Sequence, residues 1–298
     1  MSFTAIIGAG PIGGALAHKL ATRDRLADIR LIDGDGRIAA GKALDILQSA
    51  PVEGFSTRIS ATEGLAAAAG ADVIVLADHA GGQGEYVGEG GLGVLRTLSK
   101  LERRAPFVIA GGGARELIAR AVAELHVDPR RLLGSAPFAL ESALRSFAGL
   151  TVDGSGVEIS LRVVGVPPRG AVIAWEEATA FGQPISARIA AHELAALSAR
   201  IPGLWPPGPY ALASAASRIV EAIVNGSRRR FSAFVPVAHG RVASMPVELD
   251  QDGVVRIIEP SLTPQERTSM NNALARSGIE AGDGDAPSGR GRVLEPDS

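Results

Sequence analysis

The sequence contains no cysteine among its 298 residues. Disulfides, thiolate catalysis and cysteine-ligated zinc or iron–sulfur sites are therefore excluded. No uninterrupted apolar stretch reaches the roughly 20 residues that a membrane-spanning helix requires, so we expect no membrane as a partner. Neither sign of charge dominates, because 30 Lys and Arg oppose 32 Asp and Glu and leave a formal net charge of −2. That balance gives no electrostatic case for nucleic acid as a partner.

Motifs of several common sites are also missing. The H-x-x-E-H, H-E-x-x-H and D-x-D-x-D-G patterns of metal sites do not occur, so we expect no metal. The P-loop pattern G-x-x-x-x-G-K-[ST] and the G-x-S-x-G pattern of α/β-hydrolases are absent as well. The opening residues, MSFTAIIGAG, lack the basic region of a signal peptide, and we expect a cytoplasmic protein.

The first half of the sequence alternates short apolar runs with helical segments. The predicted strands are Phe3–Ile7, Asp28–Asp33, Ala71–Ala77 and Phe107–Ala110, and the predicted helices are Ile12–Ala21, Gly41–Leu47 and Leu92–Leu101. Short apolar strands separated by helices imply crossover connections and a parallel sheet that is buried on both faces. We therefore predict a Rossmann-type α/β domain over residues 1–149.

The second half has the pattern of an α+β domain, which we place at residues 150–275. The predicted strands are 157–166, 171–181, 244–249 and 254–258, and the predicted helices are 186–200, 212–225 and 264 to about 276. Asp250–Gly253 has the composition of a hairpin turn, and Thr263–Glu266 has the form of a helix capping box. The tail, residues 276–298, is rich in Gly, Asp, Pro and Ser, and we expect it to be disordered.

A glycine-rich loop follows the first predicted strand directly and opens the first predicted helix. Its G-x-G-x-x-G pattern lets a backbone turn tightly and approach a pyrophosphate, which the helix N-terminus then attracts. An acid, Asp33, ends the second strand and suits the ribose hydroxyls of NAD. We therefore predict NAD as cofactor, with binding residues Gly8, Gly10, Pro11, Ile12, Gly13 and Asp33. The alternative is a glycine turn that binds nothing.

Three further segments, together with this loop, resemble the malate/lactate dehydrogenase family. They are the helix start Gly41–Asp45 (GKALD), the strand Ala71–Ala77 (ADVIVLA) and the closing hairpin and helix Ser244–Glu266. The resemblance spans residues 3–275 and implies the family's Rossmann domain followed by an α+β domain. It also implies an NAD-dependent oxidoreductase and a homodimer or homotetramer. An active paralogue as a second subunit is an alternative partner.

The catalytic motifs of that family are altered at four places. The loop 81–93 contains no Arg or Lys, where the family carries substrate-binding arginines. Gly111–Gly113 replaces a T-N-P turn, and Leu144 replaces the arginine of a D-x-x-R pair. Pro167 stands where a G-x-H-G-D motif places the catalytic histidine. Proline cannot transfer a proton, and leucine cannot bind a carboxylate.

The remaining candidates for catalysis are Asp78, His79 and Glu141. Asp78 and His79 follow the third strand, at the edge where open α/β sheets bind ligands. Glu141 stands in for the family's orienting aspartate. The alternative, which we favour, is that Asp78 or His79 only caps the strand or hydrogen-bonds the loop. Two functions remain: an oxidoreductase acting on an unknown, non-standard small molecule, or a catalytically inactive NAD-binding pseudoenzyme with a structural or regulatory role. The lost motifs favour the second.

Overall fold

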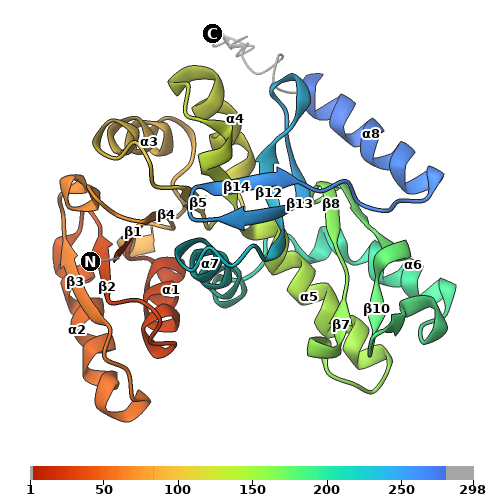
Figure 1. Ribbon diagram of the computed structural model, residues 1–298, viewed down its shortest axis with the longest axis horizontal. Coiled ribbons are helices and arrows are strands. Elements are labelled where there is room, and N and C mark those ends of the chain that lie inside the picture. The colour runs from red at the N-terminus through yellow and green to blue at the C-terminus, as the bar shows by residue number, and fades with distance from the viewer. Residues whose placement is uncertain (1–2, 83, 280–298) are drawn as a thin grey trace, which may run out of the picture.

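The structure is a computed structural model that describes residues 3–82 and 84–279. One large sheet runs through both halves of the chain, in the strand order β3-β2-β1-β4-β5-β6-β12-β13-β8-β9, with β14 paired to β13 (Figure 1). The strands from β3 to β6 pair in parallel, and the pairs from β6–β12 onward are antiparallel. This order is the doubly wound arrangement that the first half of the sequence predicts.

The N-terminal half consists of the parallel strands and the helices that connect them. The strands are β1 (Phe3–Ile7), β2 (Asp28–Ile32), β3 (Arg58–Thr62), β4 (Val73–Leu76), β5 (Phe107–Ile109) and β6 (Leu132–Gly134). The helices are α1 (Pro11–Thr22), α2 (Gly36–Glu53), α3 (Gly88–Leu101), α4 (Ala114–Leu125) and α5 (Ala136–Thr151). Short 3₁₀ turns lie at Leu65–Ala68, Ala80–Gly82 and Pro129–Arg131. Helices α3 and α4 cover one face of the sheet, and α1 covers the other together with α7 (Pro209–Val224) (Figure 1).

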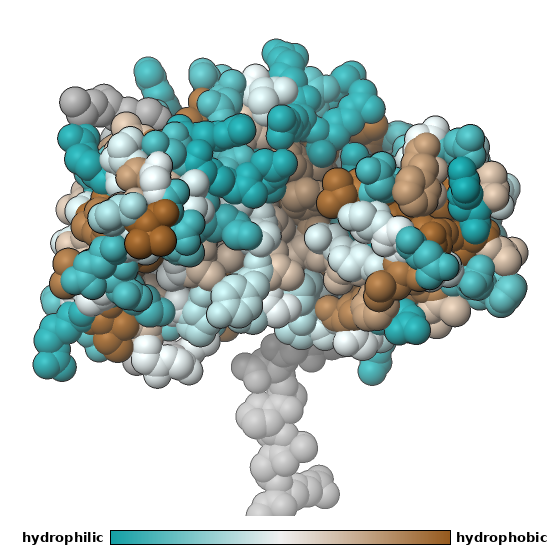
Figure 2. All heavy atoms as spheres, turned by 90° about the horizontal axis from the view of Figure 1, so that it is seen from below, coloured by the Kyte–Doolittle hydropathy of each residue, from teal (hydrophilic) through white to brown (hydrophobic). Residues whose placement is uncertain are grey.

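The C-terminal half completes the large sheet and adds a small one, β11-β10-β7. Its strands are β7 (Ile159–Ser160), β8 (Val163–Val166), β9 (Gly170–Ile173), β10 (Thr179–Ala180), β11 (Gln183–Pro184), β12 (Arg230–Pro236), β13 (Val242–Asp250) and β14 (Gly253–Ile257). Besides α7, its helices are α6 (Ala191–Ala199) and α8 (Pro264–Ile279). Figure 2 shows more hydrophobic residues at the end of the molecule that holds α6 and β10 than at the end that holds α1 and α2.

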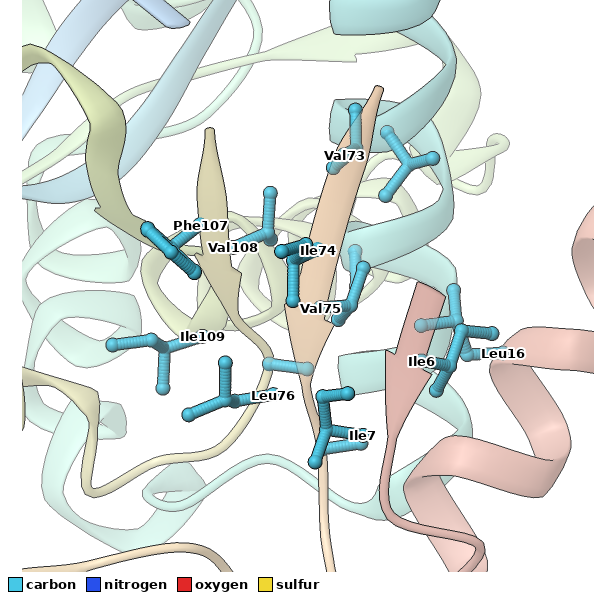
Figure 3. Packing of buried hydrophobic residues seen from close by; sticks show 14 of the residues in the cluster. Ile6, Ile7, Leu16, Val73, Ile74, Val75, Leu76, Phe107, Val108 and Ile109 are labelled. Carbon is cyan, nitrogen blue, oxygen red and sulfur yellow. The ribbon is translucent and has the colours of Figure 1, made fainter. Parts of the chain in front are cut away.

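The main core lies between the parallel sheet and its two layers of helices. Every residue of β1 and β4 is buried, as their continuous apolar runs predict for a parallel sheet covered on both faces. Figure 3 shows side chains of β1, β4 and β5 packed beside Leu16 of α1. A second apolar cluster joins α5 to β7, β8 and α6. The first cluster supports the glycine loop, and the second fills the region in which the resemblance places the catalytic motifs.

Several predicted boundaries were wrong, each for a local reason. Helix α2 begins at Gly36 rather than Gly41 because the Asp35 carboxylate caps it by accepting the N–H of Ile38. The predicted strand 157–166 begins with a 3₁₀ turn and breaks at residues 161–162, and a 3₁₀ turn at Trp175–Glu177 interrupts the strand 171–181. The helix 186–200 is shorter, because a 3₁₀ turn ends at Ala187 and α6 begins only at Ala191.

The C-terminal hairpin and capping box are confirmed. β13 and β14 pair antiparallel, and Thr263 and Glu266 exchange hydrogen bonds between each backbone N–H and the other side chain, at 2.8 and 3.2 Å. Helix α8 continues to Ile279, so residues 277–279 are helical and not part of a disordered tail. The rest of the predicted tail, 280–298, lies outside the described residues. The predicted boundary at residue 149 falls inside α5, and the division into domains stays a prediction.

Candidate functional site

The glycine loop joins β1 to α1 and is built by close backbone packing. Gly8 has a φ of +105°, a conformation that residues with a Cβ rarely adopt, and its N–H donates to the Ile32 carbonyl at 2.7 Å. A Cβ at Gly8 would overlap the Asp78 carbonyl oxygen, and one at Gly13 would overlap the Gly8 carbonyl oxygen. These two positions therefore require glycine for the fold itself, whether or not a ligand binds.

Asp33 lies beside this loop, at the end of β2, as the sequence predicts. Its carboxylate is buried and accepts the backbone N–H groups of Ala9 and Ala80, each at 2.8 Å, and of Asp35 at 2.9 Å. Burial opposes the ionised form, but these three N–H donors together hold the pKa of Asp33 below its ordinary value. Asp33 therefore ties the glycine loop to the segment that follows β4.

Asp78 follows β4 and occupies the N-terminus of α1. Its carboxylate accepts the N–H of Ile12 at 3.0 Å and the N–H of Gly13 at 2.9 Å, and only 5% of the residue is exposed. A Cβ at Gly10 would overlap the carboxyl carbon of Asp78. Burial raises the pKa of Asp78, and the two N–H donors and the charge of Lys42 oppose that rise. Asp78 therefore hydrogen-bonds the start of α1.

Lys42 supplies the positive charge of this cluster, a role that the sequence did not indicate. It extends from α2, and its Nζ donates to the Gly10 carbonyl oxygen at 3.0 Å. Pro11 is the exposed first residue of α1, and the side chain of Ile12 is buried in the core. Of the predicted cofactor residues Gly8, Gly10, Pro11, Ile12 and Gly13, only Pro11 is exposed.

The segment after β4 folds back on itself. Asp78 and Glu85 form an isolated antiparallel bridge, and the N–H of His79 donates to the Gly84 carbonyl at 2.8 Å. The His79 ring stacks on the ring of Tyr86 with centroids 3.8 Å apart. Burial, with the charges of Asp33 and Asp78, raises the pKa of the Tyr86 phenol to about 12. His79 therefore lies at the predicted edge, in contact with a neutral phenol.

Glu85 binds the second glycine turn in the way that Asp78 binds the first. Its Oε1 accepts the N–H of Gly112 and its Oε2 accepts the N–H of Gly113, both at 2.8 Å. The sequence did not predict this contact between Glu85 and the Gly111–Gly113 turn. One signal for this contact was present in the sequence: the loop 81–93 contains acidic residues and no basic ones.

Glu141, the third catalytic candidate, belongs to a different part of the molecule. It is fully buried on α5, and its Oε1 accepts a hydrogen bond from Arg162 at 2.7 Å. Burial raises the pKa of Glu141, and the Arg162 charge opposes that rise. Arg162 comes from the segment between β7 and β8. The hydrogen bonds of Asp78 and those of Glu141 share no partner among the described residues.

The other two altered positions carry no chemistry. Leu144 is completely buried and packs in the cluster that contains Leu161 and Val163. Pro167 lies in the turn between β8 and β9. Arg145 does not substitute for the missing arginine, because its guanidinium lies at 3.4 Å from the Val157 carbonyl, outside that cluster.

The sequence of this chain is similar to curated malate dehydrogenases over nearly its whole length. The enzyme from Thermomicrobium roseum is 26% identical over 289 residues, which cover 90% of this chain and 93% of that protein. The enzyme from Roseobacter denitrificans is 29% identical over 297 residues, covering 91% of this chain and 92% of that protein. These similarities support membership of the chain in the malate/lactate dehydrogenase family. No family model matches it.

Solved structures of malate/lactate dehydrogenases share its fold. Malate dehydrogenase from Salinibacter ruber superposes with a TM-score of 0.85 at 21% identity, over 94% of this chain and 97% of that one. Lactate dehydrogenase from Cryptosporidium parvum, complexed with lactic acid and NAD, also has a TM-score of 0.85, at 20% identity over 96% of this chain and 99% of that one. The predicted Rossmann-type fold of the malate/lactate dehydrogenases is confirmed.

A dinucleotide pyrophosphate and the Asp78 carboxylate would use the same backbone donors at the glycine loop. A pyrophosphate on the N-terminus of α1 needs the N–H groups of the first helical turn. Asp78 already accepts those of Ile12 and Gly13, and its carboxyl carbon fills the space beside Gly10. Two charged groups of the same sign cannot share these donors.

Two classes of site have no support in the described part of the chain. Residues 3–82 and 84–279 hold no group of three or more His, Cys, Asp or Glu side chains arranged to bind a metal ion. Across the same residues, no helix combines the length and the apolar character needed to cross a membrane.

Proposed function

We propose that this chain is a catalytically inactive member of the malate/lactate dehydrogenase family, with a structural or regulatory role. The observation that carries the proposal is Pro167 in the β8–β9 turn, at the position of the family's catalytic histidine. A proline side chain can neither accept nor donate a proton. General acid–base catalysis contributes roughly 10²–10⁴ to a rate, and its loss leaves hydride transfer without a proton partner.

The surroundings of Pro167 support the same conclusion. Leu144 replaces the arginine that would bind a substrate carboxylate, and it is completely buried in an apolar cluster. Glu141 replaces the orienting acid and is paired with Arg162 instead of a histidine. The loop 81–93 contains no basic side chain that could close over an anionic substrate. A small 2-hydroxy acid would therefore meet neither a clamp nor a proton acceptor.

NAD(H) is the cofactor that we propose for this chain. Family membership supports it, as does the NAD-complexed lactate dehydrogenase of the same fold. The groups that would hold the dinucleotide are the backbone of Gly8, Gly10, Pro11, Ile12 and Gly13, together with the Asp33 carboxylate. Assembly as a homodimer or homotetramer, or with an active paralogue, and a cytoplasmic location belong to the same proposal.

Steady-state assays test the loss of family catalysis. The purified full-length chain is incubated with NAD and malate or lactate, and with NADH and oxaloacetate or pyruvate, and the nicotinamide absorbance is followed. We expect no turnover above a protein-free control. An authentic malate dehydrogenase at the same concentration verifies the assay. Turnover within about 10²-fold of that enzyme, a smaller deficit than the loss of acid–base catalysis should cause, would refute the proposal.

A second candidate function is an oxidoreductase that acts on a different small molecule. The observation in its favour is His79, which lies at the carboxyl end of β4 next to Asp78 and is only partly buried. If His79 transfers the proton, His79→Gln abolishes any NAD-dependent turnover found by substrate screening and leaves folding intact. Equal turnover of the variant and the natural chain would remove His79 from this function.

A further inference from the structure

The Asp78 carboxylate occupies the place where a dinucleotide pyrophosphate would bind. It is an anion of the chain itself, it accepts the first free N–H groups of α1, and it is almost completely buried there. From this geometry we propose that Asp78 acts as an internal competitor of NAD. It closes the cofactor site, and NAD binds only to the fraction of molecules in which Asp78 has left the helix N-terminus.

The competition has two physical sources. Ile12 and Gly13 each have one N–H, and a second strong acceptor cannot use it while the Asp78 carboxylate is bound at 2.9–3.0 Å. In addition, a negative charge at the same helix terminus repels the pyrophosphate through a medium of low polarity. Affinity is therefore reduced by the fraction of molecules in the open state.

Neighbouring groups hold Asp78 in its closed position. The Gly8 backbone packs directly on the Asp78 carbonyl, and the N–H of Gly10 donates to that carbonyl at 2.9 Å. Lys42 supplies a compensating charge. Glu85 pairs with Asp78 in the bridge and repeats the same arrangement at Gly112 and Gly113. At each glycine turn of this edge, two neighbouring backbone N–H groups thus donate to a carboxylate of the chain itself.

The inference rests on the proposed NAD site, and one set of titrations tests the two separately. NAD, NADH and inorganic pyrophosphate are titrated calorimetrically into the natural full-length chain and into Asp78→Asn and Asp78→Ser. Asn keeps the size and one acceptor oxygen but removes the charge, and Ser also removes most of the side chain. Glu89→Gln is the matched control, because Glu89 is an acid of the first turn of α3 and pairs with Arg120 at the surface. Circular dichroism verifies that each variant is folded.

We expect both Asp78 variants to bind NAD at least tenfold more tightly than the natural chain, and Glu89→Gln to bind like the natural chain. Equal NAD affinity in the natural chain and both Asp78 variants would overturn the role of Asp78 and leave the NAD site intact. An equal gain in NAD affinity in Glu89→Gln would mean that the effect comes from overall charge, and it would also overturn the role of Asp78. No binding of NAD, NADH or pyrophosphate to any folded variant would overturn both proposals, because removal of the Asp78 carboxylate would then expose no dinucleotide site.

Discussion

The carboxyl edge of the parallel sheet and the core around α5 have lost family motifs in opposite ways. At the edge, acidic side chains have moved onto free backbone N–H groups, as Asp78 does at α1 and Glu85 at the second glycine turn. In the core, Leu144 has become part of an apolar cluster. Polar contacts at an edge can exchange for those of a ligand, whereas a filled apolar core cannot be emptied without loss of stability. We therefore expect substitutions at the edge to change ligand binding and substitutions in the core to change stability.

The largest effect is expected when the family's arginine is put back into the core. In Leu144→Arg, a charged side chain takes a completely buried position. We expect a loss of about 4 kcal/mol in the free energy of unfolding, because the guanidinium is desolvated without a designed partner and displaces apolar contacts. Urea denaturation followed by circular dichroism measures the loss.

The matched control for this substitution is Leu150→Arg, on the same helix. Leu150 is 72% exposed, so its replacement should change the free energy of unfolding by no more than about 0.5 kcal/mol. A stable Leu144→Arg variant that gains malate or lactate oxidation would show that the core still holds a substrate site, and the contrast between the two regions would fail.

An intermediate effect is expected from the buried ion pair in the same region. In Arg162→Met, Glu141 stays buried without its cation. Breaking a buried pair costs about 3–5 kcal/mol, and because the Arg162 side chain is 25% exposed we expect about 2 kcal/mol here. Adding Glu141→Gln removes the uncompensated charge, so the double variant should be more stable than Arg162→Met alone.

The pH dependence of Arg162→Met follows from the raised pKa of Glu141. A carboxyl with a pKa above its unfolded value contributes most to stability at low pH and loses that contribution as the pH rises through the folded value. Loss of Arg162 raises this pKa further. The destabilisation of Arg162→Met should therefore be smaller at about pH 5 than at about pH 8, the range over which a perturbed carboxyl titrates. The account would be contradicted if the denaturation midpoint of Arg162→Met differed from that of the natural chain by the same amount at both pH values.

Local sequence signals predicted the framework of the edge but not its polar contacts. The glycine loop and Asp33 were placed correctly because strand, turn and helix start follow one another within a few residues. The contact between Asp78 and Ile12 spans 66 residues. It depends on β1 and β4 being neighbours in the sheet, which no local pattern encodes. The one available signal was that carboxyl ends of adjacent parallel strands meet at one edge, which placed Asp78 near the loop without giving its partner.

The same limit applies to the core. Glu141 was considered as a catalytic acid because its helix resembles the family motif, yet its partner Arg162 lies in an irregular segment that the sequence predicted as continuous strand. Whether Leu144 lines a pocket or fills a cluster depends on side chains from β7, β8 and α6. These are tertiary properties. A comparison with family motifs shows which residue types differ at a position, but it does not show which side chains surround that position in the fold.

The smallest effect concerns the ionisation of Tyr86, which reports on the charge at the closed edge. Burial and the charges of Asp33 and Asp78 raise the pKa of Tyr86 to about 12, so its neutral form contributes stability that is present below the ordinary value of 10.0 and is lost as the pH rises through 12. The rise of phenolate absorbance near pH 12, the later step of a titration to high pH, should be absent in Tyr86→Phe. In Asp78→Asn the later step should move to lower pH, because one of the two charges that oppose the phenolate is gone. An unchanged later step in that variant would mean that the charge of Asp78 does not act on Tyr86. Asp78 would then contribute no negative charge to the edge where the glycine loop lies.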